Sequence, residues 1–372
     1  MKFALCSDNP VFNQDQLRDK VWCRNFPGSG WVSCLYDQAR AGAFEVVSGD
    51  IALERVKSKN WQANEVFVIS EMNAKDAVAL IKLGAKPFLM ICFEAPLYAP
   101  LFYDQLIGTS SPYSHQWVFA ENQARMEHSE SESSPPLKFP CYYLDDLMNP
   151  YPWSDRKWMA LVAENKYKTS NLFLSSPFNL KGFLRQCKYW FLQFRSPSYG
   201  ASIKNSLHNE RLEIIDYFLK SDRLNLYGSG WGSLSNLPKK WNMRLSTMIS
   251  KRYFGRCENK LEALSRYRFS ICFENMRLAG YMTEKIIDCF VAGVIPIYLG
   301  DPRVQESIPK DAYIDAREFS SLADLDKRLQ SIDENQANAM VDAGRSYLRS
   351  QQGFLHSYEG FSKNVIQLAQ KC

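Results

Sequence analysis

Residues 273–300 of this chain read FENMRLAGYMTEKIIDCFVAGVIPIYLG. An apolar strand ending at Phe273 is followed by polar residues, a glycine-containing turn and the pair Glu284 and Lys285, where a helix is expected to begin. A second apolar run over 294–298 predicts a buried strand. Strand, helix and strand in this order form a βαβ unit, which presents a helix N-terminus, and here a cation, to an anionic ligand.

The alternation of strands and helices extends on both sides of this unit. Short apolar runs between turn residues predict strands, and apolar residues three or four apart predict helices. The predicted strands are 3–6, 44–47, 66–69, 88–92, 223–227 and 269–273. The predicted helices are 74–83, 211–219, 260–265 and 284–292, with a mostly helical tail over 321–370. This alternation predicts an α/β protein with doubly wound layers.

The length of 372 residues predicts two domains, each large enough for its own core. Pro150 and Pro152 precede a new apolar run at 158–162 and mark the expected boundary. We therefore expect domains over residues 1–153 and 154–352, followed by a helical tail over 353–372.

The charge of the chain is unevenly distributed. The net charge is +5, yet the segment between Glu164 and Glu210 holds seven Lys or Arg and no acidic residue. A basic region suits phosphates, nucleotide-sugars or an anionic membrane surface, and without an accompanying motif it does not indicate nucleic acid. We expect the basic amphipathic stretch 181–195 either to rest on a membrane or to pack on the second domain with its charges outward.

The ten cysteines form no CxxC or metal-ligand cluster, which favours reduced core cysteines in the cytoplasm. The N-terminus becomes polar by Asp8, too soon for a signal peptide. No apolar run of about 18 residues predicts a transmembrane helix. We therefore expect a cytoplasmic protein, either free or peripheral on the inner face of the membrane.

Glu284 and Lys285 are the central candidates for ligand binding. Thr283 is placed to cap the helix, with the pair in its first turn. Backbone N–H groups there point at a ligand, Lys285 adds a positive charge for a diphosphate, and Glu284 is an acceptor for ribose hydroxyls. The alternative is a well-capped surface helix with an ordinary Glu-Lys pair.

The motif resembles that of the α-1,3/1,4-fucosyltransferases, glycosyltransferase family 10. Members carry Phe-Glu-Asn, then Tyr-(Ile/Val)-Thr-Glu-Lys, an apolar helix and Pro-(Ile/Val)-Tyr-Trp-Gly; here Met282 and Leu299 are apolar exchanges. The resemblance implies a GT-B fold, in which two Rossmann-like α/β domains face a central cleft, the first binding the acceptor and the second the GDP-sugar. The donor-binding residues that it implies are Arg211, Glu274, Asn275, Tyr281, Thr283, Glu284 and Lys285.

The resemblance extends outward from the motif. Tyr253, Gly255 and Lys260 match a Tyr-x-Gly-x-x-x-x-Lys stretch. Arg211 matches a helix Arg that contacts the donor diphosphate, a task that suits a planar guanidinium, although a solvated helix charge is the alternative. Ser229 replaces a second Arg of the family, so one basic contact is expected to be absent.

Residues 91–96, ICFEAP, resemble the family's Phe-Glu-Ser-Pro, whose Glu is the proposed general base. Inverting transfer requires the acceptor hydroxyl to lose its proton, so Glu94 is the expected catalytic base, with Glu121 as second candidate. The alternative is that Glu94 caps the helix that follows. No Asp-x-Asp motif ends a strand, so Arg211, Lys285 and the helix dipole are expected to stabilise the leaving diphosphate without a metal or other cofactor.

The resemblance implies an inverting enzyme that moves L-fucose from GDP-β-L-fucose to an oligosaccharide or lipopolysaccharide glycan, with O3 of GlcNAc or glucose as the expected position. Animal members carry an N-terminal membrane anchor, which we do not expect here, so the chain looks more like the soluble or peripheral bacterial type. Two alternatives stay open: a non-catalytic nucleotide-sugar or glycan-binding protein, and a transferase that uses another GDP-sugar.

Overall fold

The structure is a computed structural model that describes residues 1–371 apart from 27, 43, 109–110, 120–136, 168–186, 188–189, 193, 233 and 235–236. The chain forms two compact units. Unit 1 comprises Met1–Ala95, Phe102–Asp146 and Ser350–Cys372, and unit 2 comprises Pro96–Leu101 and Leu147–Arg349. The sequence placed the domain boundary after residue 153 and treated 353–372 as a separate tail, whereas in the structure the C-terminal segment belongs to unit 1.

Unit 1 is built on a five-stranded sheet in the order β2-β1-β3-β4-β5, in which every neighbouring pair is parallel. The strands are β1 (Lys2–Cys6), β2 (Glu45–Ser48), β3 (Val66–Glu71), β4 (Lys86–Ile91) and β5 (His115–Trp117). The helices are α1 (Lys20–Cys23), α2 (Gly30–Ala41), α3 (Gly49–Lys57), α4 (Lys75–Lys82), α5 (Pro100–Gly108), α15 (Gln351–Phe354) and α16 (Tyr358–Ala369).

The four strands predicted in this half are confirmed because each is an apolar run that is buried on both faces of a parallel sheet. In β1, the side chains from Phe3 to Cys6 are all buried. β5 was not predicted, since it has only three residues and two of them, His115 and Gln116, are polar.

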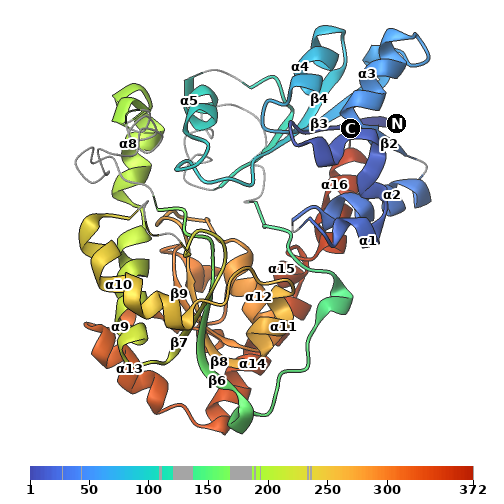
Figure 1. The fold of residues 1–372 in the computed structure, drawn as a ribbon. Coiled ribbons are helices and arrows are strands. Elements are labelled where there is room, and N and C mark those ends of the chain that lie inside the picture. Colours follow the sequence, from blue (N-terminus) through green and yellow to red (C-terminus); the bar gives the residue numbers. More distant parts are fainter. Residues whose placement is uncertain are drawn as a thin grey trace. The chain divides into compact units, whose positions relative to one another are not determined.

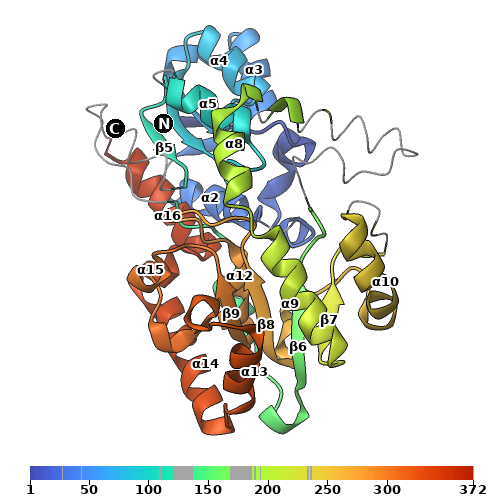
Figure 2. The same ribbon diagram turned by 90° about the vertical axis from the view of Figure 1, so that its left-hand side faces the viewer.

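The C-terminal helix α16 packs along α2, and the two lie side by side in both views (Figures 1 and 2). Ser362 donates a hydrogen bond to the carbonyl of Trp31 (2.6 Å), and the rings of Trp31 and Phe361 meet edge to face. Gly30 makes this approach possible, because a Cβ there would lie 2.5 Å from the ring of Tyr358. These contacts join the C-terminal segment to unit 1.

Unit 2 contains a second five-stranded parallel sheet in the order β10-β9-β8-β6-β7. Its strands are β6 (Lys157–Val162), β7 (Leu224–Tyr227), β8 (Tyr267–Phe273), β9 (Ile295–Leu299) and β10 (Ile314–Asp315). Its helices are α8 (Pro197–Lys204), α9 (His208–Lys220), α10 (Lys239–Arg252), α11 (Lys260–Ser265), α12 (Glu284–Ala292), α13 (Leu322–Gln330) and α14 (Glu334–Arg349).

Helices cover both faces of the unit 2 sheet: α9, α10 and α13 lie on one side, and α11 and α12 on the other (Figure 1). The core contains Phe269, Ile271 and Phe273 of β8 together with apolar residues of α9, α10 and α13. On the opposite face, Cys272 of β8 contacts Cys289 of α12. Phe273 pairs with Leu299, so the carboxyl ends of β8 and β9 lie at one edge of the sheet.

The two doubly wound α/β units confirm the predicted fold class and the βαβ unit formed by β8, α12 and β9. The central cleft stays a prediction. Most of the basic stretch 181–195, and all of Glu121, lie outside the described residues. In the part of the chain that the structure describes, no helix combines the length and apolar character needed to cross a bilayer.

Candidate functional site

Glu274, one residue beyond β8, is the centre of the candidate site. Its side chain is fully buried, and its backbone N–H donates to Leu299, which extends the ladder between β8 and β9. The carboxylate accepts hydrogen bonds from the backbone N–H (2.8 Å) and hydroxyl (2.8 Å) of Thr283 and lies 2.9 Å from Lys285 Nζ. Glu274 therefore fixes the turn before α12, as expected of a buried charge that needs full pairing.

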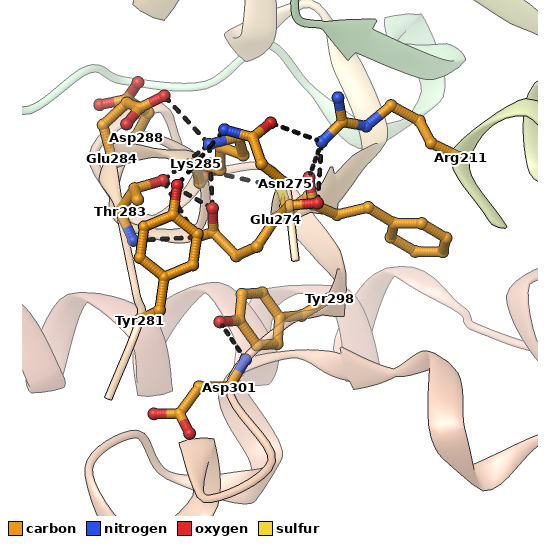
Figure 3. Close-up of polar contacts among 12 residues, drawn as sticks. Arg211, Glu274, Asn275, Tyr281, Thr283, Glu284, Lys285, Asp288, Tyr298 and Asp301 are labelled. Carbon is orange, nitrogen blue, oxygen red and sulfur yellow. Dashed lines mark hydrogen bonds and ion pairs between the residues drawn. The ribbon is translucent and has the colours of Figure 1, made fainter. Parts of the chain in front are cut away.

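Gly300 makes room for this carboxylate. A Cβ at position 300 would lie 2.5 Å from Glu274 Cγ and 2.6 Å from the hydroxyl of Tyr298. The Tyr298 hydroxyl accepts the backbone N–H of Asp301, so the chain after β9 is held close beneath Glu274 (Figure 3). The sequence prediction did not include Gly300, although its place directly after a predicted strand is a signal of close backbone approach.

Lys285 keeps its positive charge in a mostly buried position. Its Nζ lies 2.8 Å from Thr283 Oγ1 and 3.5 Å from Glu284 Oε1, in addition to Glu274. Burial opposes the charge, but the carboxylates of Glu274 and Glu284 outweigh it and raise the pKa of Lys285 above its usual value. The side chain is 13% exposed, so a charged group stands at the first turn of α12 without being sealed off.

The structure corrects the predicted role of Thr283. Thr283 is the residue that precedes α12, but its side chain makes no capping hydrogen bond to the helix. The hydroxyl donates to Glu274 and accepts from Lys285 instead. Thr283 therefore does not cap the first N–H groups of α12.

Glu284 begins α12 and is held ionised. Burial opposes its charge, but Lys285 and Lys260 outweigh that effect and lower the pKa of Glu284 to about 2. The side chain is 34% exposed, which suits a carboxylate that accepts hydrogen bonds from a ligand.

Arg211 comes from α9 and reaches the end of β8. Its Nη2 donates to the carbonyls of Phe273 (2.6 Å) and Glu274 (2.9 Å) and to Asn275 Oδ1 (3.2 Å) (Figure 3). Arg211 is buried, which lowers its pKa below the usual value, and its Nε has no hydrogen-bond partner among the described residues. The guanidinium is thus not the solvated charge of the alternative interpretation; these contacts leave a buried cation bonded to neutral oxygens.

Asn275 and Tyr281 connect Arg211 to the turn before α12. The Asn275 amide donates to the hydroxyl of Tyr281 at 3.3 Å, and its backbone carbonyl accepts the N–H of Leu207 at the start of α9. All seven predicted donor-binding residues therefore gather at the carboxyl edge of the unit 2 sheet, where ligands bind in open α/β sheets.

Glu94 lies in unit 1, three residues after β4, and its side chain is exposed. Its backbone carbonyl accepts the hydroxyl of Tyr103 at 2.9 Å. The residues directly after it form turns, and α5 begins only at Pro100, so Glu94 does not cap a helix. The other candidate base, Glu121, lies outside the described residues.

Among the described residues, no group of three or more His, Cys, Asp or Glu side chains is arranged to hold a metal ion. The adjacent carboxylates of Asp145 and Asp146 form ion pairs with Arg24. The positive groups at the candidate site include the side chains of Arg211 and Lys285 and the start of α12. This arrangement suits an anion such as a diphosphate.

Two solved structures share this fold. Anabaena Alr3699/HepE, solved in complex with UDP, matches with a TM-score of 0.56 at 9% identity and covers 100% of this chain and 99% of its own. A glycosyltransferase from Rickettsia africae matches with a TM-score of 0.50 at 11% identity, covering 100% and 98%. The two α/β units and these likenesses define the GT-B type of fold.

Sequence comparison relates part of the chain to one glycosyltransferase family. Residues 204–341 match the model of the glycosyltransferase family 10 (fucosyltransferase) C-terminal region, which confirms the predicted family resemblance over the part that holds all seven donor-binding candidates.

Relatives of this region carry fucosyltransferase names. The chain is 42% identical over 198 residues to the alpha-(1,3)-fucosyltransferase FucT of Helicobacter pylori, covering 50% of this chain and 35% of that protein. It is 35% identical over 116 residues to a mouse 4-galactosyl-N-acetylglucosaminide 3-alpha-L-fucosyltransferase 9, covering 29% and 32%. The alignments thus span about a third of these relatives.

Proposed function

We propose that this protein is an inverting α-1,3-fucosyltransferase that moves L-fucose from GDP-β-L-fucose to a glycan hydroxyl. The observation that carries the proposal is Arg211, a buried guanidinium bonded to neutral oxygens, close to Lys285 and the start of α12. A buried cation of this kind suits a diphosphate. The names of the Helicobacter pylori and mouse relatives support fucose as the transferred sugar.

In the proposed reaction, an acceptor hydroxyl attacks the anomeric carbon of fucose as the bond from that carbon to the GDP oxygen breaks. Glu94 takes the hydroxyl proton, and GDP leaves with the electron pair of the broken bond. Arg211, Lys285 and the N–H groups of α12 stabilise the charge that develops on the diphosphate, so we propose that no metal or other cofactor is needed. Excess EDTA should then leave most of the activity; complete loss that Mg²⁺ or Mn²⁺ reverses would contradict this.

The acceptor is proposed to be an oligosaccharide or lipopolysaccharide glycan, with O3 of GlcNAc or glucose as the site of transfer. The alternatives are a non-catalytic nucleotide-sugar or glycan-binding protein and a transferase that uses another GDP-sugar. Simultaneous presence of Glu94, Arg211 and Lys285 favours catalysis over binding alone.

A donor screen separates these functions. Radiolabelled GDP-fucose, GDP-mannose and UDP-sugars are each offered with a panel of GlcNAc- and glucose-containing acceptors. We expect transfer from GDP-fucose, loss of transfer in Arg211→Lys, and no change in Lys327→Ala, which alters an exposed Lys of α13. Transfer from another GDP-sugar alone would establish the second alternative, and binding of GDP-fucose without any transfer would establish the first.

We also propose that the protein works in the cytoplasm, peripheral to an anionic membrane surface. The described cysteines are free thiols, in keeping with a reducing compartment. Trp190, Phe191 and Phe194 are 44%, 53% and 71% exposed, and they lie in the segment that has seven basic and no acidic residues. Exposed aromatic and basic side chains together favour an anionic interface. The protein should co-sediment with vesicles containing phosphatidylglycerol; equal binding to pure phosphatidylcholine would contradict the charge argument.

A further inference from the structure

Lys260, the first residue of α11, lies between two carboxylates of α12. Its Nζ is 2.6 Å from Asp288 Oδ2 and 4.0 Å from Glu284 Oε1. Asn259 fixes the start of α11 by accepting the backbone N–H of Glu262 at 3.0 Å. The ammonium group is thus delivered by a capped helix to a defined position beside the candidate site.

Glu284 and Asp288 are one turn apart on α12, so their charges repel each other across the same face of the helix. Asp288 is the more buried of the two, with a side chain 8% exposed against 34% for Glu284. A buried carboxylate requires a partner, and Lys260 is the cation closest to it. Lys260 therefore pairs directly with Asp288 and attracts the Glu284 carboxylate electrostatically from a greater distance.

We propose that Lys260 and Asp288 are positioning residues that keep the Glu284 carboxylate ionised and oriented toward the ribose hydroxyls of the donor nucleotide. The inference rests on the proposed function, in which Glu284 accepts those hydrogen bonds. Neither residue needs to touch the nucleotide, since both act through Glu284.

Each member of the pair has a distinct task. Lys260 offsets the repulsion between the two carboxylates and favours the ionised form of Glu284. Asp288 draws the ammonium group toward itself, so that Lys260 does not close on Glu284 and occupy the oxygen that a ribose hydroxyl would use. The other charged groups around Glu284 are Lys285 on α12, Glu274 after β8 and Arg211 on α9, and they are unchanged by substitutions in the pair.

The test compares the binding of GDP with that of 2′,3′-dideoxy-GDP, which lacks the ribose hydroxyls. Both affinities are measured by titration calorimetry on the full chain from about pH 5 to about pH 8. The ratio of the two affinities reports the hydroxyl contacts and cancels the protonation of the diphosphate itself. The proteins are the wild type, Lys260→Met, Lys260→Arg, Asp288→Asn and the control Arg266→Gln, which removes an exposed ion pair with Glu262 on the same helix.

Above about pH 6, where Asp288 is ionised, we expect the wild type and Arg266→Gln to prefer GDP by about tenfold or more, the worth of a hydrogen bond to a charged group. Lys260→Met should lose most of this preference, increasingly at acidic pH because Glu284 then protonates more readily. Asp288→Asn should also lose it, because Lys260 is released onto Glu284. Lys260→Arg should restore most of the preference, since its guanidinium reaches both carboxylates.

If Lys260→Met and Asp288→Asn both prefer GDP over its dideoxy analogue as strongly as the wild type does at every pH, the positioning role is wrong. The proposed function would stay intact. A wild type that binds GDP and its dideoxy analogue equally would remove the role of Glu284 itself, and with it the basis of this inference. Failure to bind GDP at all would count against the proposed function. Circular dichroism checks that each variant is folded. If Lys260→Met does not fold, the two conservative variants, Lys260→Arg and Asp288→Asn, still decide the test.

Discussion

At the scale of single residues, the side chains that we propose to bind the ligand also hold the fold together. Lys285 pairs with the fully buried carboxylate of Glu274, and Arg211 bonds the carbonyls at the end of β8. Alanine at either cation therefore leaves buried polar groups without partners. Loss of activity in such a variant would not by itself distinguish a lost ligand contact from a damaged fold.

A paired substitution separates the two roles of Lys285. Lys285→Met should lower the free energy of unfolding by about 3–5 kcal/mol, because Glu274 is left charged and unpaired in the interior. Adding Glu274→Gln should recover most of that stability, since the amide needs no cation. GDP affinity should stay about 1.5–3 kcal/mol weaker in both variants, because the contact to the diphosphate is absent from each.

Urea unfolding and calorimetry measure these two quantities. The control is Lys310→Met, which breaks an exposed pair with Glu318 and should cost less than about 1 kcal/mol. Full recovery of GDP binding in the double variant would show that Lys285 acts only on the fold.

Glu94 should respond differently from the cations. Glu94→Gln keeps the size of the side chain but cannot take the proton from the acceptor hydroxyl, so kcat should fall by roughly 10²–10⁴-fold. The decrease of kcat at acidic pH, which reports protonation of the base, should disappear as well. GDP affinity should barely change, because Glu94 lies in unit 1 and the donor-binding candidates lie in unit 2. Steady-state kinetics with GDP-fucose check this, with the exposed Glu45→Gln as control. Near-native turnover would move the base to Glu121 or another carboxylate of the N-terminal half.

At the scale of elements, the start of α12 belongs to the candidate site and the rest of the helix packs in the core. Its start carries Glu284 and Lys285, whereas Ile286, Ile287 and Phe290 are buried against neighbouring elements. The helix ends at Gly293, whose φ of 68° is the left-handed conformation that glycine adopts without strain. The three carboxylates of Glu274, Glu284 and Asp288 share two lysines, so their ionisation is coupled to the stability of the element.

This sharing predicts a pH dependence centred on Asp288. Burial, together with the charge of Glu284, raises the pKa of Asp288 to about 6 against the opposing attraction of Lys260. The folded state therefore holds this proton more tightly than the unfolded chain does. The stabilisation from the protonated Asp288 is present in acid and is lost as pH rises from about 4 to about 6. The free energy of unfolding should fall by about 3 kcal/mol over this range.

Urea unfolding across this pH range measures the effect as a difference between the wild type and Asp288→Asn. The free energy of unfolding of the wild type should fall relative to that of the variant up to about pH 6 and then run parallel to it. Asp342→Asn, at an exposed position of α14, serves as control. Parallel curves for Asp288→Asn throughout would contradict the raised pKa.

At the scale of the whole molecule, the chain closes unit 1 with its own C-terminus. Residues from Ser350 onward join strands that form at the other end of the sequence, and the ring of Phe361 contacts Trp31, Phe93 and Trp117. Unit 1 therefore completes its core only when the last helix has docked.

Phe361→Ala should destabilise unit 1 by about 3–5 kcal/mol, because it leaves a cavity among aromatic side chains. GDP affinity should be nearly unchanged, since the donor-binding candidates belong to unit 2. Thermal unfolding and calorimetry report the two effects, and Lys363→Ala, an exposed change on the same helix, is the matched control. Equal melting temperatures for the two variants would contradict the closing role of α16.

The sequence by itself determined the α/β class, the β8–α12–β9 unit and the seven donor-binding candidates. Apolar runs and their spacing report which faces are buried, and six of the seven candidates lie within Glu274–Lys285, where local geometry alone brings them near the start of α12. The family resemblance added Arg211, Glu274, Asn275, Tyr281 and Glu94 to Thr283, Glu284 and Lys285. Short polar strands such as β5 escaped prediction because they carry no apolar pattern.

Only the tertiary structure decided which partners these groups have. Arg211 meets the carbonyl of Glu274 across 63 residues of sequence, Lys260 arrives from another helix, and α16 returns to α2. The tertiary structure also shows that Thr283 bonds Glu274 and does not cap the helix, because a fully buried carboxylate needs hydrogen-bond donors. Periodicity shows that a side chain is buried, whereas the identity of what covers it depends on how distant segments pack.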